Sequence, residues 1–343
     1  MSTNDLNNSL PLEPLNTYLG AHLPGFSGLR EVTKFPNGQS NPTYLLLAQS
    51  GRYVLRRKPQ GALLASAHAV DREYRVIRAL AGTAVPVPEA LLLCADDSVI
   101  GSMFYVMAFL DGRTLWNHTL PGFSLAERRL IYDELNRVLA ALHAVDITAV
   151  GLEDYGRPGN YYERQISRWG RQYRATETGG SDSMEKLIAW LERNVPADDG
   201  RRCLVHGDYR LDNLMFDRSE ARAIAVLDWE LSTLGHPLAD LAYQCAQWRF
   251  PHDADLMPGL GGLDRRALGI PTEEEYVGMY CERLGIASIT HWNFYLAVSY
   301  FRLAAICQGV YKRGLDGNAS SERATQFGHL AEQVARTACD LLD

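Results

Sequence analysis

Several features that define common protein classes are missing from this sequence of 343 residues. It has no uninterrupted apolar run long enough to cross a membrane, because the most apolar stretch, residues 294–311, contains Arg302 and Gln308. The six cysteines lie far apart without a Cys-x-x-Cys pair, so neither a zinc site nor a disulfide framework is predicted. The N-terminal stretch MSTNDLNNSLPLEPL lacks the basic and apolar regions of a secretory signal. We therefore expect a cytoplasmic protein with reduced thiols and no membrane partner.

An excess of positive charge is also missing. The chain has 34 Lys and Arg against 41 Asp and Glu, and the net charge of −7 is spread along the sequence. This balance gives no reason to expect a nucleic acid as partner. The apolar and charged fractions, 46% and 22%, are those of an ordinary globular protein, and the length allows two lobes. No feature predicts an oligomeric state.

Periodicity divides the sequence into a strand-rich part and a helical part. The first part contains a helix over 66–82, with Val70, Tyr74, Ile77 and Leu80 on one face. The predicted strands of this part lie near 29–35, 43–49, 52–58, 89–95 and 102–109. The helices expected downstream cover 124–145, 161–176, 182–194, 272–284 and 291–312, with a last one from about 321. A hairpin over 214–228 interrupts them.

These elements predict an α+β protein with a small β-rich N-lobe and a larger, mainly helical C-lobe. The expected parts are a polar leader over 1–24, an N-lobe over 25–107, a hinge over 108–112 and a C-lobe over 113–343. A cleft between two such lobes is a natural place for a small molecule.

The segment LVHGDYRLDNLMFD, residues 204–217, concentrates polar side chains between short apolar runs. Asp208 could accept a proton from a substrate hydroxyl. Asn213, five residues later, and Asp228, twenty residues after Asp208, offer the hard oxygen ligands that Mg²⁺ prefers. Taken singly, each of these residues could equally cap a turn. Taken together, their spacing favours a catalytic and metal-binding role.

The spacing of His, Asp and Asn in HGDYRLDNLMF, followed by VLDWELSTLGHPLADLAY, resembles the aminoglycoside phosphotransferase/choline kinase-like family. Within that family the chain is most similar to the kinase-like domain fused ahead of acyl-CoA dehydrogenases in some eukaryotic proteins, and to stand-alone bacterial relatives. The resemblance covers residues 25 to 335 and implies a bilobal protein-kinase-like fold. It also implies a kinase that uses ATP and Mg²⁺, with Asp208 as the catalytic base and Asn213 and Asp228 as metal ligands.

The same resemblance suggests roles around the catalytic loop. His206 is expected to brace the loop rather than exchange protons. Arg210 could stabilise charge on the transferred phosphoryl group, or could be an exposed arginine on a polar loop. Asp240, in HPLADLAY, resembles the family aspartate that holds the loop backbone from below. Its alternative role is a helix cap, which is also structural.

In the N-lobe, YVLR at 53–56 resembles the strand that places a phosphate anchor, which makes Arg56 the candidate, with Lys58 as the alternative. Glu73 is the candidate ion-pair partner. Further candidates come from the turn that replaces a glycine-rich loop and from the hinge. They are Gly38, Gln39, Ser40 and Asn41 toward the phosphates, Ala108 and Leu110 toward adenine, and Met107 at the back of the pocket.

The nature of the acceptor is less constrained. Arg164, Arg168 and Arg171 are spaced to share one face of a helix, which is either a solvated surface or a site for an anionic substrate. The resemblance points to hydroxyacyl substrates, with a hydroxyacyl-CoA or a related hydroxy acid as the specific expectation. An aminoglycoside or choline-type kinase is the alternative enzyme. A pseudokinase that binds nucleotide or acts as a scaffold is the alternative outside enzymes, and GTP is the alternative to ATP.

Departures from the protein-kinase pattern indicate a small-molecule kinase that needs no activation. Gly207 stands where a phosphorylation-dependent kinase has arginine, so an activating phosphate has no anchor there. Trp229 and Glu230 follow the metal aspartate in place of Phe-Gly. The segment that follows is too short to bind a peptide. We therefore expect a constitutively competent enzyme.

Overall fold

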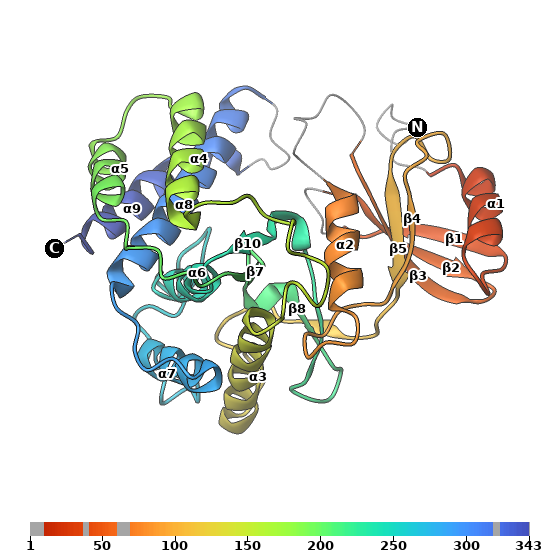
Figure 1. Ribbon diagram of the computed structural model, residues 1–343, viewed down its shortest axis with the longest axis horizontal. Helices are drawn as coiled ribbons and strands as arrows, with labels where there is room; N and C mark the ends of the chain where they lie inside the picture. The colour runs from red at the N-terminus through yellow and green to blue at the C-terminus, as the bar shows by residue number, and fades with distance from the viewer. Residues whose placement is uncertain (1–9, 37–40, 60–68, 318–322, 343) are drawn as a thin grey trace. The chain divides into compact units, whose positions relative to one another are not determined.

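The computed structural model describes residues 10–36, 41–59, 69–317 and 323–342. The chain divides into two compact units (Figure 1). The N-terminal unit comprises Met1–Arg113 with Ile224–Glu230, and the C-terminal unit comprises Thr114–Ala223 with Leu231–Asp343. The short segment around Asp228 thus belongs to the N-terminal unit, although it follows the catalytic loop in the sequence.

An antiparallel sheet of five strands forms the N-terminal unit, in the order β1-β2-β3-β5-β4. Its strands confirm the alternation read from the sequence, because apolar side chains on one face of TYLLLA and its neighbours are buried. The strands are β1 (Leu29–Lys34), β2 (Thr43–Ala48), β3 (Gly51–Arg57), β4 (Ala90–Cys94) and β5 (Phe104–Ala108).

Helix α2 (Val70–Leu80) packs against β4 and β5. Its buried face contains Val76 and Glu73, whereas Tyr74, which the sequence placed on that face, is only half-buried. Tyr74 lies at the edge of that face, where its ring contacts the Tyr105 ring of β5 with ring centres 6.1 Å apart, while Glu73 is fully buried. A buried carboxylate needs partners, and those partners are described with the site.

The N-terminal residues differ from the polar leader expected over 1–24. Helix α1 (Leu12–His22) packs beside β1 (Figure 1), and its Leu15 and Leu19 are fully buried in the core of the N-terminal unit. Leucines four residues apart lie on one face of a helix. This spacing was present in the sequence, but it was obscured by the polar residues between the leucines.

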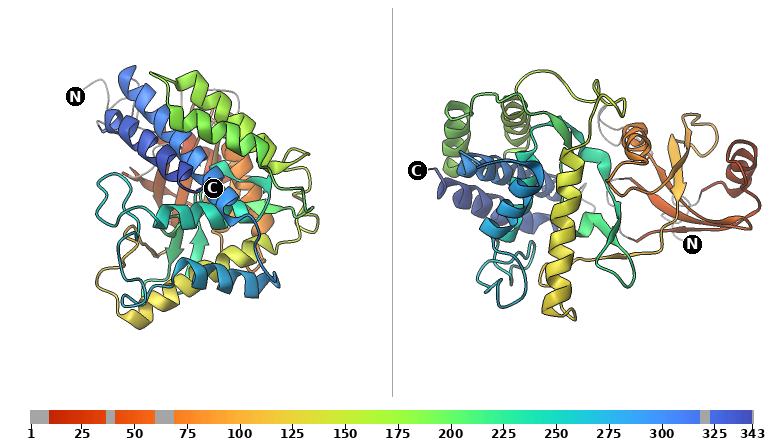
Figure 2. Two further views of the ribbon diagram at one scale, coloured as in Figure 1. Left: turned by 90° about the vertical axis from the view of Figure 1, so that its left-hand side faces the viewer. Right: turned by 60° about the horizontal axis from the view of Figure 1, so that its bottom comes forward.

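The C-terminal unit is mainly helical (Figure 1, Figure 2). Its long helix α8 packs against α4, α6 and α9, so the apolar stretch around Arg302 is a buried helix, as predicted. The helices are α3 (Leu125–His143), α4 (Tyr161–Thr176), α5 (Asp182–Arg193), α6 (Leu238–Trp248), α7 (Glu273–Leu284), α8 (Trp292–Leu315) and α9 (Phe327–Cys339). None of the helices that the structure describes combines the length and apolarity needed to span a bilayer.

Short strands carry the loops of interest. Strand β7 (Cys203–Val205) pairs antiparallel with β10 (Thr233–Gly235), and neither strand was predicted from the sequence, nor was α6. The predicted hairpin begins at β8 (Leu214–Phe216), where the Asp217 N–H donates to the Arg222 carbonyl at 2.9 Å and closes the turn before β9 (Ala223–Val226). The remaining elements are β6 (Arg113–Thr114), η1 (Leu211–Asn213), η2 (Trp229–Leu231) and η3 (Ala324–Gln326).

Candidate active site

The polar loop 206–210 joins β7 to η1 and β8 in the C-terminal unit. Leu204 and Val205 before it and Leu214 after it are fully buried, so both ends of the loop are anchored in the core. Such anchoring lets a loop hold polar side chains in fixed positions. The apolar runs that bracket this segment in the sequence are therefore the anchors of its catalytic candidates.

Asp240, in the first turn of α6, supports the loop. Its buried carboxylate accepts hydrogen bonds from the N–H of His206 at 2.7 Å and from the N–H of Gly207 at 2.8 Å. The Nε2 atom of His143 lies 3.2 Å from the same carboxylate. Burial alone would raise the pKa of Asp240, but the bonds with His143 and the loop lower it below the ordinary value. The loop is thus held by an ionised buried carboxylate, and His143 is a partner that the sequence did not predict.

Asp208 is fixed from two sides. Its N–H donates to His206 Nδ1 at 3.2 Å, which places His206 in the bracing position expected for it. The Asn213 side-chain amide donates to the Asp208 carbonyl at 2.8 Å and to its carboxylate Oδ2 at 3.0 Å. Because the Asn213 nitrogen is engaged in these bonds, its amide oxygen is the atom that can act as a metal ligand.

Arg210 lies beside two carboxylates. Its Nη2 is 2.5 Å from Asp212 Oδ2, and its Nε is 3.7 Å from Asp208 Oδ2. Asp212 therefore holds the guanidinium in place. His118 is a further neighbour, because burial and the charge of Arg210 lower the pKa of His118 to about 4. A neutral His118 leaves Arg210 as the cation of this loop.

Gly207 has a steric reason to be glycine. Its φ of +85° is in the left-handed region, and a Cβ at this position would lie 2.5 Å from the carbonyl oxygen of Leu231. The loop therefore has no room for any side chain immediately before Asp208. The missing phosphate anchor noted from the sequence has the same structural cause.

In the N-terminal unit, Arg56 forms a cluster with three acids. Its Nε is 2.9 Å from Glu73, and its Nη2 is 2.6 Å from Asp228 and 3.8 Å from Glu230. Burial alone would lower the pKa of Arg56, but Glu73 and the other acids raise it, so the guanidinium stays charged. Among the residues that the structure describes, the Lys58 side chain forms no ion pair with Glu73 or Asp228. The partner of Glu73 is therefore Arg56.

Glu73 has two further partners. Asn41 donates its side-chain amide to Glu73 Oε1 at 2.6 Å, and the Tyr105 hydroxyl donates to Oε2 at 3.3 Å. Burial raises the pKa of Glu73, and Arg56 offsets part of that rise. The side chain of Asn41 is buried against Glu73, and the expected contact of Asn41 with phosphate stays a prediction. Gly38, Gln39 and Ser40 lie outside the described residues.

Asp228 follows β9 with a φ of +65°, an unusual conformation for a residue other than glycine. Such strain is found where surrounding contacts hold a functional side chain in place. The Trp229 indole N–H donates to the Val226 carbonyl at 3.0 Å and helps to fix this turn. The Asp228 carboxylate, whose side chain is 37% exposed, is accessible to a cation despite its bond to Arg56.

Magnesium fits these donors chemically. Within the described ranges, no group of three or more His, Cys, Asp or Glu could hold a metal ion by itself. An amide oxygen of Asn213 and a carboxylate of Asp228 are nevertheless the few hard ligands that Mg²⁺ takes when waters and phosphate oxygens complete its octahedron.

The expected adenine segment lies at the end of β5. Met107 is buried, and the N–H of Ala108 donates to the Glu89 carbonyl at 2.9 Å. In the part of the chain that the structure describes, the Leu110 N–H has no backbone partner. The role of Leu110 toward adenine stays a prediction.

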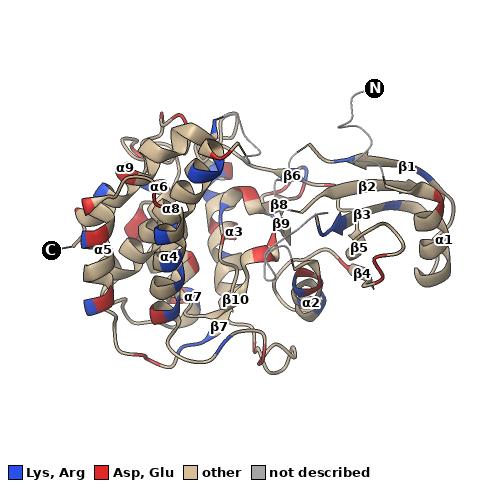
Figure 3. Cartoon of the chain, turned by 90° about the horizontal axis from the view of Figure 1, so that it is seen from above, with Lys and Arg blue, Asp and Glu red and all other residues tan. Residues whose placement is uncertain are grey.

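The arginines that recur along α4 (Figure 3) have different partners. Arg164 bonds the carbonyls of Pro158 and Gly159, and Arg171 donates to Ser167 Oγ at 2.6 Å. Arg168 instead lies over the Trp169 ring at 5.2 Å from its centre. The structure therefore separates Arg168 from the other two.

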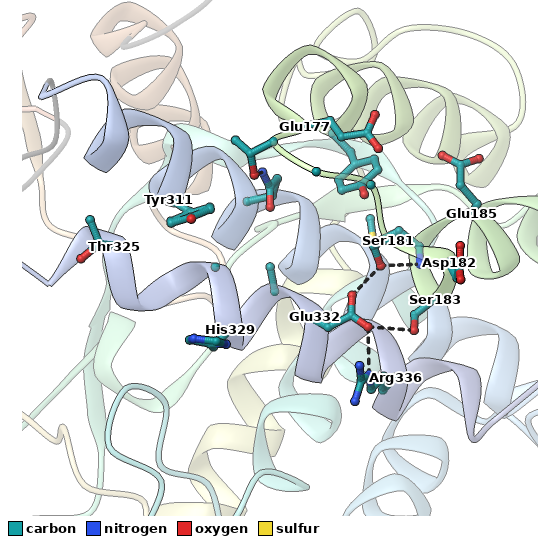
Figure 4. A pocket seen from close by; sticks show the side chains of 18 residues that line it. Glu177, Ser181, Asp182, Ser183, Glu185, Tyr311, Thr325, His329, Glu332 and Arg336 are labelled. Atoms are coloured by element: carbon teal, nitrogen blue, oxygen red, sulfur yellow. Dashed lines mark hydrogen bonds and ion pairs between the residues drawn. The ribbon is translucent and has the colours of Figure 1, made fainter.

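A cavity of about 790 Å³ lies elsewhere in the C-terminal unit, lined by α5, α9 and neighbouring residues (Figure 4). Glu332 dominates its polar wall, but this carboxylate accepts hydrogen bonds from Ser181 at 2.5 Å and Ser183 at 3.1 Å and pairs with Arg336 at 2.9 Å. The Glu332 carboxylate is thus paired within the cavity wall. The cavity includes no residue of the catalytic loop, and we assign it no chemistry.

The fold and the loop define a kinase-like phosphotransferase with an alcohol group as acceptor. The model of the phosphotransferase enzyme family matches residues 31–276, and the chain belongs to this family. This confirms the family and the α+β kinase-like fold expected from the sequence.

The chain is similar to three proteins of different kinds. It is 48% identical over 333 residues to acyl-CoA dehydrogenase family member 10 of Mus musculus. The matched region is 97% of this chain but only 31% of the mouse protein, so the chain spans about a third of that relative. A crystal structure from Ralstonia eutropha, provisionally assigned as an aminoglycoside phosphotransferase, is 48% identical, with a TM-score of 0.89 and coverage of 97% and 98%. Aminoglycoside phosphotransferase APH(4)-Ia, solved with AMP-PNP and hygromycin B, shares the fold at 17% identity, with a TM-score of 0.62 and coverage of 95% and 98%.

Proposed function

We propose that this protein transfers the γ-phosphate of ATP, with Mg²⁺, to a hydroxyl group of a small molecule that carries an acyl chain. The observation on which the proposal rests is the catalytic loop, where Asp208 is held by Asn213 and His206 while Asp240 bonds the loop backbone. A base fixed in this way can select one orientation of an incoming hydroxyl.

In the proposed reaction, Asp208 accepts the hydrogen bond of the acceptor hydroxyl and takes its proton as the new O–P bond forms. The bond between the γ-phosphorus and ADP breaks on the side opposite that oxygen, so that ADP departs in line with the attacking hydroxyl. The side chain of Asp208 is 21% exposed, so a hydroxyl can reach its carboxylate. Positioning supplies most of the rate enhancement in such reactions, which agrees with the number of contacts devoted to this residue.

Two arginines would neutralise the phosphates. Arg56 is aligned by Glu73, and Glu73 is in turn held by Asn41 and Tyr105, so this guanidinium is preorganised for the nucleotide. Arg210 is aligned by Asp212 next to the base. We propose Arg56 for the bound ATP and Arg210 for the charge on the transferred group.

Asn213 and Asp228 are the proposed Mg²⁺ ligands, each through an oxygen atom. When bound, the ion neutralises the β- and γ-phosphate oxygens and so favours departure of ADP. Asp228 also pairs with Arg56, so ATP binding would exchange this contact for one with the metal. Leu110 and Ala108 are the proposed adenine contacts, with Met107 behind the ring.

A hydroxyacyl-CoA or a related hydroxy acid is the acceptor that we propose. Support comes from the similarity to a protein named as an acyl-CoA dehydrogenase family member, although this chain covers only 31% of that protein. The alternative is an aminoglycoside, as in the protein solved with hygromycin B. Arg168 and Arg302 favour the anionic acceptor, because a polycationic one would be repelled by unneutralised guanidiniums.

The proposal can be tested by acceptor-dependent release of ADP with Mg·ATP. The panel contains hydroxyacyl-CoAs, free hydroxy acids, aminoglycosides and choline, with phosphorylation of the acceptor checked by mass spectrometry. Turnover of hydroxyacyl compounds is expected. Turnover of aminoglycosides alone would contradict the acyl proposal, and nucleotide binding without any turnover would favour the pseudokinase.

A further inference from the structure

Arg302 has features that a purely structural role does not explain. It lies in the buried helix α8, and its guanidinium carbon is 4.8 Å from the centre of the Tyr243 ring and 5.5 Å from that of Trp169. Its Nε atom is buried and has no hydrogen-bond partner in the described part of the chain. Aromatic faces offset only part of the cost of desolvating a cation.

Arg168 contacts one of the two aromatic rings that Arg302 contacts. It lies over the Trp169 ring, at 5.2 Å. Partial burial and the charge of Arg302 lower the pKa of Arg168, so the two like charges affect each other. Within the described ranges, no carboxylate forms an ion pair with either of them. By contrast, the nearby Arg174 pairs with Glu185 at 3.3 Å.

Tyr243 connects this arginine pair to the reaction centre. The Tyr243 ring is buried, and burial together with the neighbouring Asp208 carboxylate raises the pKa of its phenol. Tyr243 therefore has two neighbours of interest: Asp208, the proposed base, is near its hydroxyl, and the guanidinium of Arg302 lies over its ring. All of these residues belong to the C-terminal unit.

We propose that Arg302 and Arg168 form an anion-binding subsite that holds a carboxylate or phosphate group of the acceptor while its hydroxyl meets Asp208. Planar guanidiniums suit both anions, since each can donate two parallel hydrogen bonds. The bound anion would supply the missing counter-charge, and the subsite would select acceptors whose anionic group lies across the Tyr243 ring from the reacting hydroxyl. This inference rests on the proposed kinase function.

The test compares matched acceptors with Arg302→Met, which removes the charge, keeps an unbranched side chain and suits an apolar helix. Each hydroxy acid is assayed beside its neutral methyl ester and its CoA thioester. We expect KM for the anionic acceptors to rise about 10- to 100-fold, as for loss of a charge-assisted hydrogen bond, with KM for ATP unchanged. The ester should be bound poorly by the wild type and unaffected by the change.

The arms of this test distinguish the two sources of anion. A loss confined to the free acid assigns the subsite to its carboxylate, and a loss confined to the thioester assigns it to a CoA phosphate. Arg302→Lys should restore part of the affinity. Arg171→Met is the matched control, because within the described residues Arg171 bonds only Ser167 on the same helix, and it should behave like the wild type.

Arg168→Met is the second test variant, since Arg168 is exposed and its loss should not impair folding. Equal affinity of wild type and both variants for the anionic acceptors would overturn the proposal, as would an equal loss for acid and ester. Calorimetric binding of the acid and ester without ATP reads the subsite even if no acceptor is phosphorylated. Failure of the kinase function and failure of the subsite are therefore separable.

Discussion

At the scale of single residues, the site depends on acids and bases that are held by other side chains. Asp240 accepts hydrogen bonds from the N–H groups of His206 and Gly207, the two residues before Asp208. Glu73 orients Arg56. These supporting carboxylates are more deeply buried than the residues that they serve. Substituting Asp240 or Glu73 should therefore change both the stability of the protein and the alignment of the residue that each one supports. The balance between the two effects should differ between Asp240 and Glu73.

Asp240→Asn should lower the free energy of unfolding by about 2–4 kcal/mol at neutral pH, because it breaks a buried, hydrogen-bonded charge. The folded-state pKa of Asp240 is lowered, so its contribution is present above the ordinary aspartate value of about 3.9 and is lost as pH falls through the folded pKa. Denaturant unfolding of wild type and variant between neutral and acidic pH measures this. A difference in stability that stays constant as the pH falls would contradict the assignment.

Glu73→Gln should leave the fold intact, because the glutamine oxygen can still accept the hydrogen bond from Asn41 and its amide nitrogen can donate to the Tyr105 hydroxyl oxygen. The loss of the ion pair should release Arg56 from its aligned position and raise KM for ATP about tenfold, with a smaller change in KM for the acceptor. Steady-state kinetics in both substrates tests this. Arg57→Gln is less suited as a control because Arg57 is buried, whereas Lys58→Gln should have little effect if Arg56 is the anchor.

At the scale of elements, the sequence predicted most helices and strands, and it missed those whose signal is short or indirect. Strands β7 and β10 have three residues each, too few to establish a period. Helix α1 did have a signal, the four-residue spacing of Leu15 and Leu19, within a segment that is otherwise polar. Local pattern is therefore informative for long elements and weak for the short ones that frame the site.

Leu19→Ala tests whether α1 belongs to the core of the N-terminal unit. Because Leu19 is fully buried, its truncation should destabilise the protein by about 2–5 kcal/mol. Leu12→Ala is the matched control, since Leu12 on the same helix is 49% exposed and should cost little. Thermal unfolding of the two variants gives the comparison. Equal stabilities would show that α1 contributes nothing to the core.

At the scale of the whole molecule, the spacing of motif residues predicted the candidate site, whereas hydrophobic periodicity predicted only helices and strands. The positions of Asp208, Asn213 and Asp228 followed from spacing, whereas their supports did not. His143 lies 97 residues from Asp240, and Asn41 lies 32 residues from Glu73, so only the folded chain brings each pair together. Arg302 was read as an interruption of an apolar helix, and its neighbours became apparent only from the packing of α4 and α6 on α8.

The most direct test of the central claim is Asp208→Asn, assayed with the best acceptor and, separately, for binding of Mg·ATP by calorimetry. Asparagine keeps the shape of the side chain but cannot take the proton of the hydroxyl. We predict that kcat falls by about 10²- to 10⁴-fold while Kd for Mg·ATP changes little. Turnover equal to that of the wild type would contradict the assignment of Asp208 as the base and, with it, the proposed mechanism.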